Sequence, residues 1–284
     1  MSYNRIILEK KLKEYIEEDC QFTDVSSSFI PEDAVSSAKI IAKSKGYISG
    51  LVELEILFES LEVEIIIKKK DGDAVDKGDI VAEIKGNTRK ILIGERVGLN
   101  LLTHMSAITT MTRKYVNLVK ELKKKVKIAA TRKTIPGMRI FEKRAVELGG
   151  GDTHRFSLDD MILLKDTHLR YYQGDIAKLL KTVKERASFS KKIEIEVEKI
   201  DDVIVAAENG ADIIMLDNMN PNQVKEAIAT LNNKGLRKQV LIEISGNINW
   251  DNIADYIKAE PDVISTSQIT QFPGEKVDLS LRFD

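Results

Sequence analysis

Short apolar runs alternate with segments of helical periodicity through the second part of the chain. The apolar runs occupy residues 126–130, 161–164, 193–197, 213–216, 240–244 and 263–264, and the helical segments occupy residues 175–187, 201–209, 221–231 and 251–258. Strands that alternate with helices across short connections pair into a parallel sheet, and six or more such units favour a barrel. This part of the chain is therefore predicted to form a closed or nearly closed parallel α/β barrel.

The first part of the chain has a different pattern. Residues 4–19 predict a short helix with one apolar side, and Pro31 is expected to open a second helix because proline suits the first helical position. Residues 38–90 combine β-rich runs with glycine-containing turn signals, which predicts strands. Residues 95–124 show apolar spacings of three, four and seven, which predicts a long helix.

The tail at residues 277–284 alternates apolar and polar positions, as an antiparallel strand does. We expect this strand to return to the first part of the chain. The predicted organisation is thus an N-terminal α/β domain at residues 1–110, joined by the strand at residues 275–284, and a barrel domain at residues 111–274.

Charge and cysteine content exclude several classes of protein. The 284 residues include 44 Lys and Arg against 45 Asp and Glu, a balance that does not suit a general nucleic-acid-binding protein. The single cysteine, Cys20, excludes a disulfide framework and fits a reducing cytoplasm. Since the sequence shows neither a signal peptide nor an apolar run of transmembrane length, we expect a cytoplasmic protein with no membrane partner.

Basic side chains are concentrated where predicted strands end. Arg132 and Lys133 follow the first apolar run, and Lys165 ends the second. Between them, His154 and Arg155 come shortly after three consecutive glycines. Guanidinium forks, ammonium groups and glycine N–H groups all suit carboxylate or phosphate oxygens, so this stretch predicts a site for a small polyanionic ligand.

Polar residues follow each predicted strand, and a barrel places its active site at the carboxyl ends of its strands. These residues are Arg132-Lys133, Lys165-Asp166, Glu196, Glu198, Asp217-Asn218, Ser245-Gly246-Asn247 and Ser265-Thr266-Ser267. The cationic members suit a ligand that carries carboxylates, and the last two, hydroxyl-rich loops suit a phosphate. The separated carboxylates Glu196 and Asp217 suit Mg²⁺.

Charges at two further places need an explanation. Arg96 lies in the expected first turn of the long helix, where the helix dipole disfavours a cation, so either a surface position or an external ligand accounts for it. Glu194, Glu196 and Glu198 share one face of a strand by the period of two. At least one of these carboxylates is expected to have a cationic partner or a metal.

Some side chains fit more than one role. Lys165 also suits a Schiff-base lysine in an aldolase-like barrel, or a structural ion pair with Glu196 or Asp217. The surroundings of His104 and His168 in the sequence settle no role for either.

Six segments, in this order and spacing, match a known family: ERVGLNLLTHMSAITT, ATRKTIPGMRIFEKRAVELGGGDTHR, MILLKDTH, IEVE, ADIIMLDNM and EISGNI. The chain resembles quinolinate phosphoribosyltransferases, which are also called nicotinate-nucleotide pyrophosphorylases (carboxylating). The resemblance covers essentially the whole chain. It implies a small α/β sandwich domain and an incomplete parallel α/β barrel.

The resemblance implies the Mg²⁺-dependent reaction of quinolinate with phosphoribosyl pyrophosphate, which gives nicotinate mononucleotide, pyrophosphate and CO₂ in NAD biosynthesis. It assigns the quinolinate carboxylates to Arg132, Lys133, His154, Arg155 and Lys165, with Arg96 supplied by the partner subunit of a homodimer or higher homo-oligomer. It assigns the ribose and Mg²⁺–pyrophosphate side to Glu196 and Asp217, and the 5′-phosphate to the loops Ser245-Gly246-Asn247 and Ser265-Thr266-Ser267. Lys165, Glu196 and Asp217 are the expected catalytic residues.

Three positions depart from the family's pattern. Asn247 stands where a second glycine is usual, Ser267 replaces a glycine, and Gln271 replaces a histidine. These departures affect the predicted phosphate site and leave the cationic residues intact. The remaining rivals are a nicotinate-specific or uncharacterised transferase of the same fold, a Schiff-base aldolase, and a non-catalytic anion-binding protein.

Overall fold

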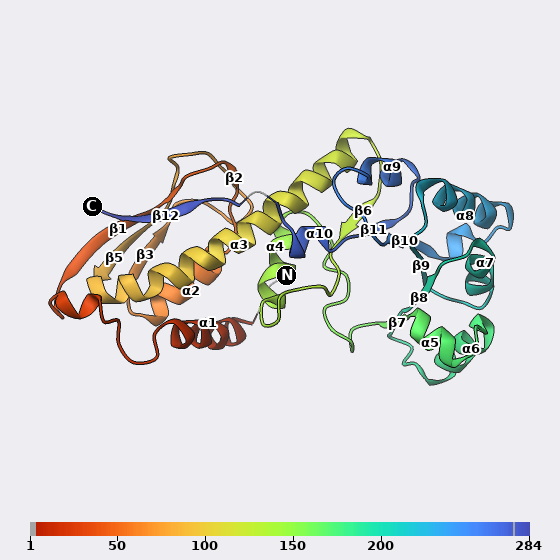
Figure 1. The fold of residues 1–284 in the computed structure, drawn as a ribbon, viewed down its shortest axis with the longest axis horizontal. Helices are drawn as coiled ribbons and strands as arrows, with labels where there is room; N and C mark the ends of the chain where they lie inside the picture. The colour runs from red at the N-terminus through yellow and green to blue at the C-terminus, as the bar shows by residue number, and fades with distance from the viewer. Residues whose placement is uncertain (1–3, 275) are drawn as a thin grey trace. The chain divides into compact units, whose positions relative to one another are not determined.

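The computed structural model describes residues 4–274 and 276–284, and the chain divides into two compact units (Figure 1). The first unit comprises Met1–Thr112, Ile140–Gly149 and Pro273–Asp284, and the second comprises Arg113–Arg139 and Gly150–Phe272. None of the helices in the described parts of the chain combines the length and apolar character that crossing a membrane requires.

An antiparallel sheet packed with helices forms the first unit. The sheet has the order β12-β1-β5-β3 and consists of β12 (Leu279–Phe283), β1 (Val35–Ala42), β5 (Ile80–Asn87) and β3 (Glu64–Ile67). A separate pair joins β2 (Gly46–Tyr47) to β4 (Ala74–Val75). The helical elements are α1 (Arg5–Asp19), the short η1 (Ser27–Phe29), α2 (Leu51–Ser60), the first part of α3 (Thr88–Glu121) and α4 (Arg139–Leu148).

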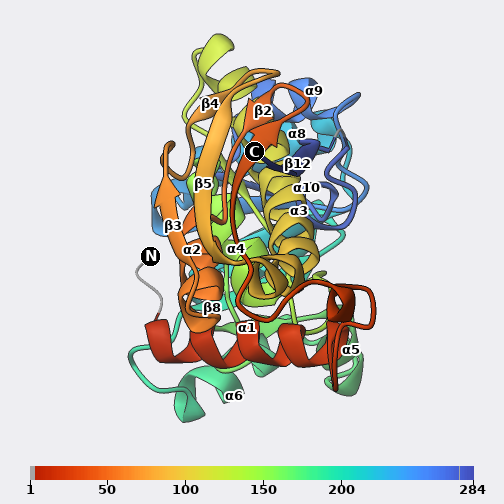
Figure 2. The ribbon, with the colours of Figure 1, turned by 90° about the vertical axis from the view of Figure 1, so that its left-hand side faces the viewer.

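The sheet and the helices of this unit face the viewer in Figure 2, and one apolar core joins them. Ile40 of β1 and Ile84 of β5 are buried with Phe58 of α2 and Leu102 of α3. Burying side chains of this size stabilises the fold by about 1.5–3 kcal/mol each. Because β12 pairs antiparallel with β1, with Leu281 opposite Ile40, the chain's tail returns to this unit, as its alternating pattern predicted.

Two predictions for the first unit are wrong. Residues 31–34 form a turn that leads into β1, in which the Ala34 N–H donates to the Pro31 carbonyl at 3.1 Å, so Pro31 opens no helix. Residues 51–60, which lay within the predicted strand region, form α2. Most of its side chains, including that of Glu53, are buried. A helix that is buried on most sides lacks the alternation of apolar and polar faces from which a helix is predicted.

Six parallel strands form the sheet of the second unit. In spatial order they are β6 (Lys127–Ala129), β11 (Val263–Ser265), β10 (Leu241–Ser245), β9 (Ile213–Asp217), β8 (Ile193–Val197) and β7 (Ile162–Leu164). The helices that connect or follow them are α5 (Asp166–Tyr171), α6 (Ile176–Arg186), α7 (Ile200–Glu208), α8 (Pro221–Asn233), the short η2 (Arg237–Gln239), α9 (Ile253–Lys258) and, after β11, α10 (Gln268–Gln271). In the described residues β6 and β7 remain edge strands, so the sheet forms an incomplete barrel. The predicted strands and helices of this part are confirmed.

Local chemistry sets where α8 begins. The Asn220 side chain accepts hydrogen bonds from the N–H groups of Asn222 and Gln223, and the Gln223 side chain accepts one from the N–H of Asn220. Pro221 occupies the first helical position, where its missing N–H has no consequence. The helix therefore starts directly after the loop that follows β9.

The division between the units differs from the predicted one in one segment. It falls after Thr112, inside α3 and two residues beyond the predicted residue 110, but Ile140–Gly149 belong to the first unit and not to the predicted barrel domain. Arg144 of α4 fixes this segment there, because it pairs with the buried Glu53 and with Asp71 at 2.9 and 2.6 Å. These partners lie far away in the sequence, so the order of elements along the chain concealed the arrangement.

Candidate active site

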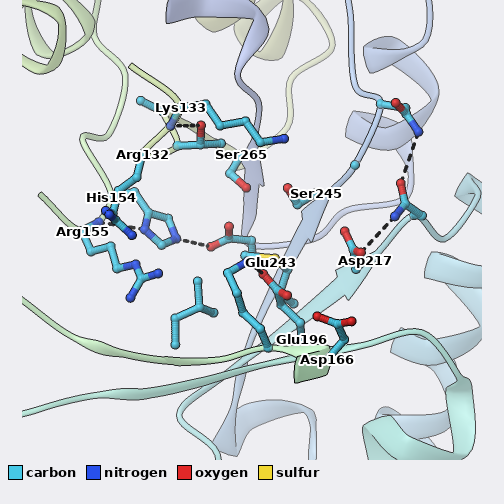
Figure 3. A pocket seen from close by; sticks show the side chains of 18 of the residues that line it. Arg132, Lys133, His154, Arg155, Asp166, Glu196, Asp217, Glu243, Ser245 and Ser265 are labelled. Carbon is cyan, nitrogen blue, oxygen red and sulfur yellow. Dashed lines mark hydrogen bonds and ion pairs between the residues drawn. The ribbon is translucent and has the colours of Figure 1, made fainter. Parts of the chain in front are cut away.

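A cavity of about 690 Å³ lies at the carboxyl ends of the strands of the second unit (Figure 3). The predicted site residues that line it are Arg132, Lys133, His154, Arg155, Lys165, Glu196, Asp217, Ser245, Gly246, Asn247 and Ser265. The parallel register places Asp217 opposite Ser245 and Glu196 opposite Met215, so polar residues from successive loops meet at one edge of the sheet. The expected location of the site at the strand ends follows from this geometry.

One side of the cavity is cationic. Arg155 is only 7% exposed, and burial, together with the charge of Arg132, lowers the pKa of its guanidinium from the usual value. The buried Nε of Arg132 has no hydrogen-bond acceptor within the described residues. The positive charges of Arg132 and Arg155 repel each other, and a bound anion would offset this repulsion and accept hydrogen bonds from both guanidinium groups. Lys133 adds an exposed ammonium on the same side.

Lys165 and Glu196 form an ion pair within the cavity, with 2.5 Å between Nζ and Oε1. Burial raises the pKa of Glu196 and the bond to Lys165 opposes this shift, while the charges of Asp217 and Asp166 raise it further. The expectation that one glutamate of this strand has a cationic partner is confirmed. The pair also matches the structural role that the sequence left open for Lys165.

The carboxylates of Glu196 and Asp217 fit a magnesium ion. Glu196 lies one residue before the end of β8 and Asp217 ends the adjacent β9, and the charge of Asp217 contributes to the raised pKa of Glu196, an effect that a divalent cation would oppose. Oxygen donors of this kind, completed by water and substrate oxygens, are what Mg²⁺ prefers. Asp217 is oriented by Asn218, whose Nδ2 donates to Oδ2 of Asp217 at 2.9 Å.

The third side of the cavity is small and polar. The buried hydroxyl of Ser265 has no hydrogen-bond partner within the described residues, and Ser245 lies nearby on the lining. Gly246 has a φ of +99°, and a Cβ at this position would lie 2.3 Å from Oδ1 of Asn218, so the backbone approaches Asn218 only because this residue is glycine. Nδ2 of Asn247 donates to the same Asn218 oxygen at 3.3 Å.

Thr266 and Ser267, which the sequence assigned to the phosphate site, do not line the cavity. Oγ1 of Thr266 donates to the Ile248 carbonyl at 2.7 Å and accepts from the N–H of Gln268 at 3.1 Å. Ser267 is the residue before α10. Both residues therefore belong to the turn between Ser265, the last residue of β11, and α10. The strand pattern by itself could not distinguish this structural role from direct contact with a ligand.

Arg96 is exposed on α3 in the first unit and is not among the residues that line the cavity. Because α3 begins at Thr88 rather than near residue 95, Arg96 does not lie in the first helical turn. The argument from the helix dipole for its role is therefore wrong.

Two histidines have structural partners. Nδ1 of His168 accepts a hydrogen bond from the N–H of Lys165 at 3.0 Å at the start of α5. Nε2 of His104 lies 2.9 Å from Oε1 of the buried Glu142 in the first unit. Neither histidine lines the cavity.

Glu243 is a cavity residue that the sequence analysis did not single out. It is 1% exposed and lies in β10 between two apolar residues, and an acidic side chain inside an apolar strand was the available signal. Glu194 of β8 is fully buried as well, and burial together with the nearby Glu243 raises the pKa of Glu194 to about 9.

Known proteins match this chain over nearly its full length. The family model for the N-terminal domain of quinolinate phosphoribosyl transferase matches residues 21–106, and the model for the C-terminal domain matches residues 108–282. A protein of Archaeoglobus fulgidus named probable nicotinate-nucleotide pyrophosphorylase (carboxylating) is 45% identical over 245 residues, which cover 86% of this chain and 93% of that protein.

Two further relatives agree. The nicotinate-nucleotide pyrophosphorylase (carboxylating) of Dictyostelium discoideum is 36% identical over 97% of this chain and 95% of its own. The solved structure of the nicotinate-nucleotide pyrophosphorylase from Francisella tularensis superposes with a TM-score of 0.91 at 33% identity, covering 100% of this chain and 98% of that one.

An incomplete α/β barrel with cationic, carboxylate and hydroxyl-bearing sides around one cavity defines a phosphoribosyltransferase-type enzyme. More particularly, the chain belongs to the quinolinate phosphoribosyl transferase family.

Proposed function

We propose that this protein catalyses the reaction of quinolinate with phosphoribosyl pyrophosphate to nicotinate mononucleotide, pyrophosphate and CO₂, a step of NAD biosynthesis. The observation that carries this proposal is the pair of guanidinium groups of Arg132 and Arg155 that face the carboxylates of Glu196 and Asp217 across one cavity (Figure 3). A ligand with two carboxylates needs several cations. A second, phosphorylated substrate would bind at the opposite side of the cavity, through a metal ion held by Glu196 and Asp217.

Quinolinate carries carboxylates on adjacent ring carbons. Arg132, Lys133, Arg155 and Lys165 line the side of the cavity that would bind them, and each charge-assisted hydrogen bond contributes about 1.5–3 kcal/mol. A monocarboxylate such as nicotinate would leave part of this charge uncompensated, so specificity for the dicarboxylate follows.

Phosphoribosyl pyrophosphate would occupy the remaining sides. The loop from Ser245 to Asn247 suits its 5′-phosphate, and the O–H of Ser265, which has no other partner in the described residues, would donate a hydrogen bond to a phosphate oxygen. Glu196 and Asp217 would hold Mg²⁺, which neutralises charge on the pyrophosphate as it leaves.

The bond changes require no protein nucleophile. The quinolinate nitrogen forms a bond to C1′ of the ribose while the C1′–O bond to pyrophosphate breaks, and fixed carboxylates such as Glu196 stabilise the positive charge that develops on the ribose. The ring nitrogen then carries a positive charge. The carboxylate beside it leaves as CO₂, its electron pair remains on the ring carbon, and that carbon takes a proton from water.

The lysine chemistry of an aldolase fits the structure less well. A Schiff-base lysine must present a free amine to a carbonyl, whereas Nζ of Lys165 lies 2.5 Å from Oε1 of Glu196 and is engaged in that contact. A simple anion-binding protein would have no use for the carboxylates of Glu196 and Asp217.

A homodimer or higher homo-oligomer and a cytoplasmic location belong to the same proposal. Arg96 is exposed on α3, as a side chain that reaches the site of a partner subunit must be. Exposed aromatic side chains of the first unit, Phe22 and Phe29, support an interface there. The lone thiol of Cys20 suits a reducing compartment.

The test is a product assay with phosphoribosyl pyrophosphate, Mg²⁺, and either nicotinate or quinolinate labelled with ¹³C in the carboxyl beside the ring nitrogen. We expect labelled CO₂ and nicotinate mononucleotide from quinolinate, with little product from nicotinate. Turnover of nicotinate in preference to quinolinate would overturn the assignment of the second carboxylate. Removal of Mg²⁺ by EDTA should abolish turnover and readdition should restore it.

A further inference from the structure

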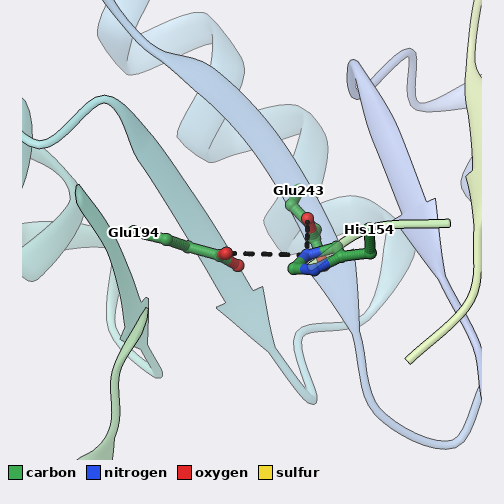
Figure 4. A group of neighbouring side chains, drawn as sticks. All are labelled: His154, Glu194 and Glu243. Atoms are coloured by element: carbon green, nitrogen blue, oxygen red, sulfur yellow. Dashed lines mark hydrogen bonds and ion pairs between the residues drawn. The ribbon is translucent and has the colours of Figure 1, made fainter. Parts of the chain in front are cut away.

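Two residues that line the cavity, His154 and Glu243, meet the buried Glu194 of β8 (Figure 4). Nε2 of His154 lies 3.0 Å from Oε2 of Glu243 and 3.5 Å from Oε2 of Glu194. Both carboxyl groups are buried, and a polar atom of each of the three residues lies within 4.8 Å of the others. Such a cluster could bind a metal ion, or it could be a set of hydrogen bonds that holds the imidazole of His154 in place. The two roles require opposite tautomers of the imidazole.

The other nitrogen of the imidazole decides between them. The N–H of Arg155 donates to Nδ1 of His154 at 2.7 Å, so Nδ1 presents its lone pair and carries no proton. The proton of the neutral ring is therefore on Nε2, where it is donated to Glu243. A metal on Nε2 would require the opposite tautomer, and that tautomer would set an Nδ1–H against the N–H of Arg155. The arrangement fits a support and not a metal site.

The backbone conformation at His154 indicates what these hydrogen bonds stabilise. His154 has a φ of +52°, an uncommon conformation for a residue other than glycine, and its N–H donates to Oδ1 of Asp152 at 2.8 Å. The ring nitrogens then connect the next N–H, that of Arg155, to Glu243 in β10. The loop that carries Arg155 is thus attached through His154 to the sheet.

We propose that Glu243 is a positioning residue, which holds His154 in the Nε2–H tautomer and through it fixes Arg155 for the ligand's carboxylate. This inference rests on the proposed function and deepens it. His154 then has both ring nitrogens committed to the protein, so it supports the cationic side of the cavity instead of donating a hydrogen bond to quinolinate.

The tautomer can be tested without any assumption about activity. The chain has three histidines, so long-range ¹H–¹⁵N spectra of the ¹⁵N-labelled protein, with His154→Gln for assignment, report the protonation of each imidazole nitrogen. At pH 7.5 we expect His154 to show a protonated Nε2 and an unprotonated Nδ1. A protonated Nδ1, alone or together with Nε2, would overturn the inference whether or not the protein acts on quinolinate.

Variants separate the support from a metal site. In Glu243→Gln the amide oxygen can still accept from Nε2–H, so the dissociation constant for quinolinate should change less than about threefold. Glu243→Ala should raise it about tenfold or more, with the affinity for phosphoribosyl pyrophosphate and the Mg²⁺ concentration for half-maximal activity unchanged. Equal losses in the two variants, or a shifted Mg²⁺ requirement, would show that the charge of Glu243 is what matters and would contradict the inference.

His154→Asn provides a second route if Glu243→Ala does not fold. Asparagine tolerates a positive φ, and its Oδ1 occupies the place of Nδ1, so the bond from Arg155 is kept while the bond to Glu243 is lost. We expect quinolinate binding to weaken about as much as in Glu243→Ala, and the double variant to be no weaker than either single one. Additive losses, or unchanged binding in His154→Asn, would exclude positioning through His154. If the unmodified protein failed to bind quinolinate, the proposed function would be contradicted. The tautomer measurement would still show whether Glu243 accepts a hydrogen bond from Nε2 of His154.

Discussion

The ammonium group of Lys165 and the carboxylate of Glu196 lie 2.5 Å apart in the free protein, although the proposed function assigns them to different substrates. Quinolinate must therefore compete with Glu196 for Lys165. Occupation of Glu196 by the Mg²⁺–pyrophosphate side would release Lys165 for the other ligand. The two halves of the site are thus coupled through a single ion pair.

This competition predicts that Glu196→Gln binds quinolinate more tightly when phosphoribosyl pyrophosphate is absent. The side chain of Lys165 is 46% exposed, so solvent screens the pair, and the gain should be at most about fivefold. Titration calorimetry with quinolinate alone measures it, and turnover should fall in the same variant. Weaker quinolinate binding would mean that Glu196 helps to orient Lys165 for the ligand instead of competing with it.

Lys165→Ala should lower kcat/KM for quinolinate by about tenfold to 150-fold, because one charge-assisted contact contributes about 1.5–3 kcal/mol. Lys181→Ala, which removes an exposed lysine of α6, is the matched control and should leave activity unchanged. The two proteins should have the same melting temperature. Retention of most activity in Lys165→Ala would remove this residue from the site.

Arg96 provides a test of the subunit arrangement. If it completes the site of a partner subunit, Arg96→Ala and Lys165→Ala should each retain at most about a tenth of the normal activity as pure proteins. A mixture whose subunits have exchanged should recover about a quarter of the normal activity, because half of the molecules pair the two variants and each of these has one intact site. A fully exchanged mixture that stays inactive would place both residues in the site of one subunit.

Gly246→Ala should impair the use of phosphoribosyl pyrophosphate and lower the melting temperature. A Cβ at this position would lie 2.3 Å from Oδ1 of Asn218, which orients Asp217. Gly78→Ala is the matched control, since Gly78 has the same φ of +99° but nothing within 4 Å of an added Cβ. In both variants alanine is strained at this positive φ by about 1–2 kcal/mol, so both should be less stable. Only Gly246→Ala should also raise the KM for phosphoribosyl pyrophosphate, by about tenfold or more. Similar kinetics in the two variants would exclude the contact with Asn218 as the cause.

Stability should depend on pH through Glu53. Burial raises the pKa of this carboxyl from 4.5 to about 7, even though the charge of Arg144 opposes the shift. The folded protein then holds the proton more tightly than the unfolded chain, so this contribution to stability is complete below about pH 4.5 and is lost as the pH rises through about 7. Urea denaturation of the native protein should show the free energy of unfolding falling between pH 5 and pH 8 relative to Glu53→Gln. Glu55→Gln, on the same helix, should retain the native slope; an unchanged slope in Glu53→Gln would mean that the ion pair with Arg144 outweighs burial.

The amino-acid sequence specified the barrel because its strands are short, apolar and regularly spaced. A parallel strand buried on both faces is mostly apolar, and here only Glu194, Glu196 and Glu243 interrupt the pattern inside the described strands, so the limits of the strands are visible as runs. The residues that follow each run mark the carboxyl end. For this reason Arg132, Lys165, Glu196 and Asp217 could be placed at one site from the sequence. The same reasoning failed for α2. Most of its side chains are buried, so its sequence shows no clear helical period, and the burial of Glu53 could not be predicted.

Tertiary structure decided what depends on pairing between distant residues. Whether Thr266 contacts a ligand or bonds to the Ile248 carbonyl, and whether Glu243 is solvated or paired with His154, depends on distances across the sheet that no local pattern records. The sequence determined which residues stand at the strand ends, since strand formation depends on local apolarity. Only packing determined their partners, because a hydrogen bond or an ion pair requires two groups to approach within about 3 Å, and this approach is a property of the whole fold.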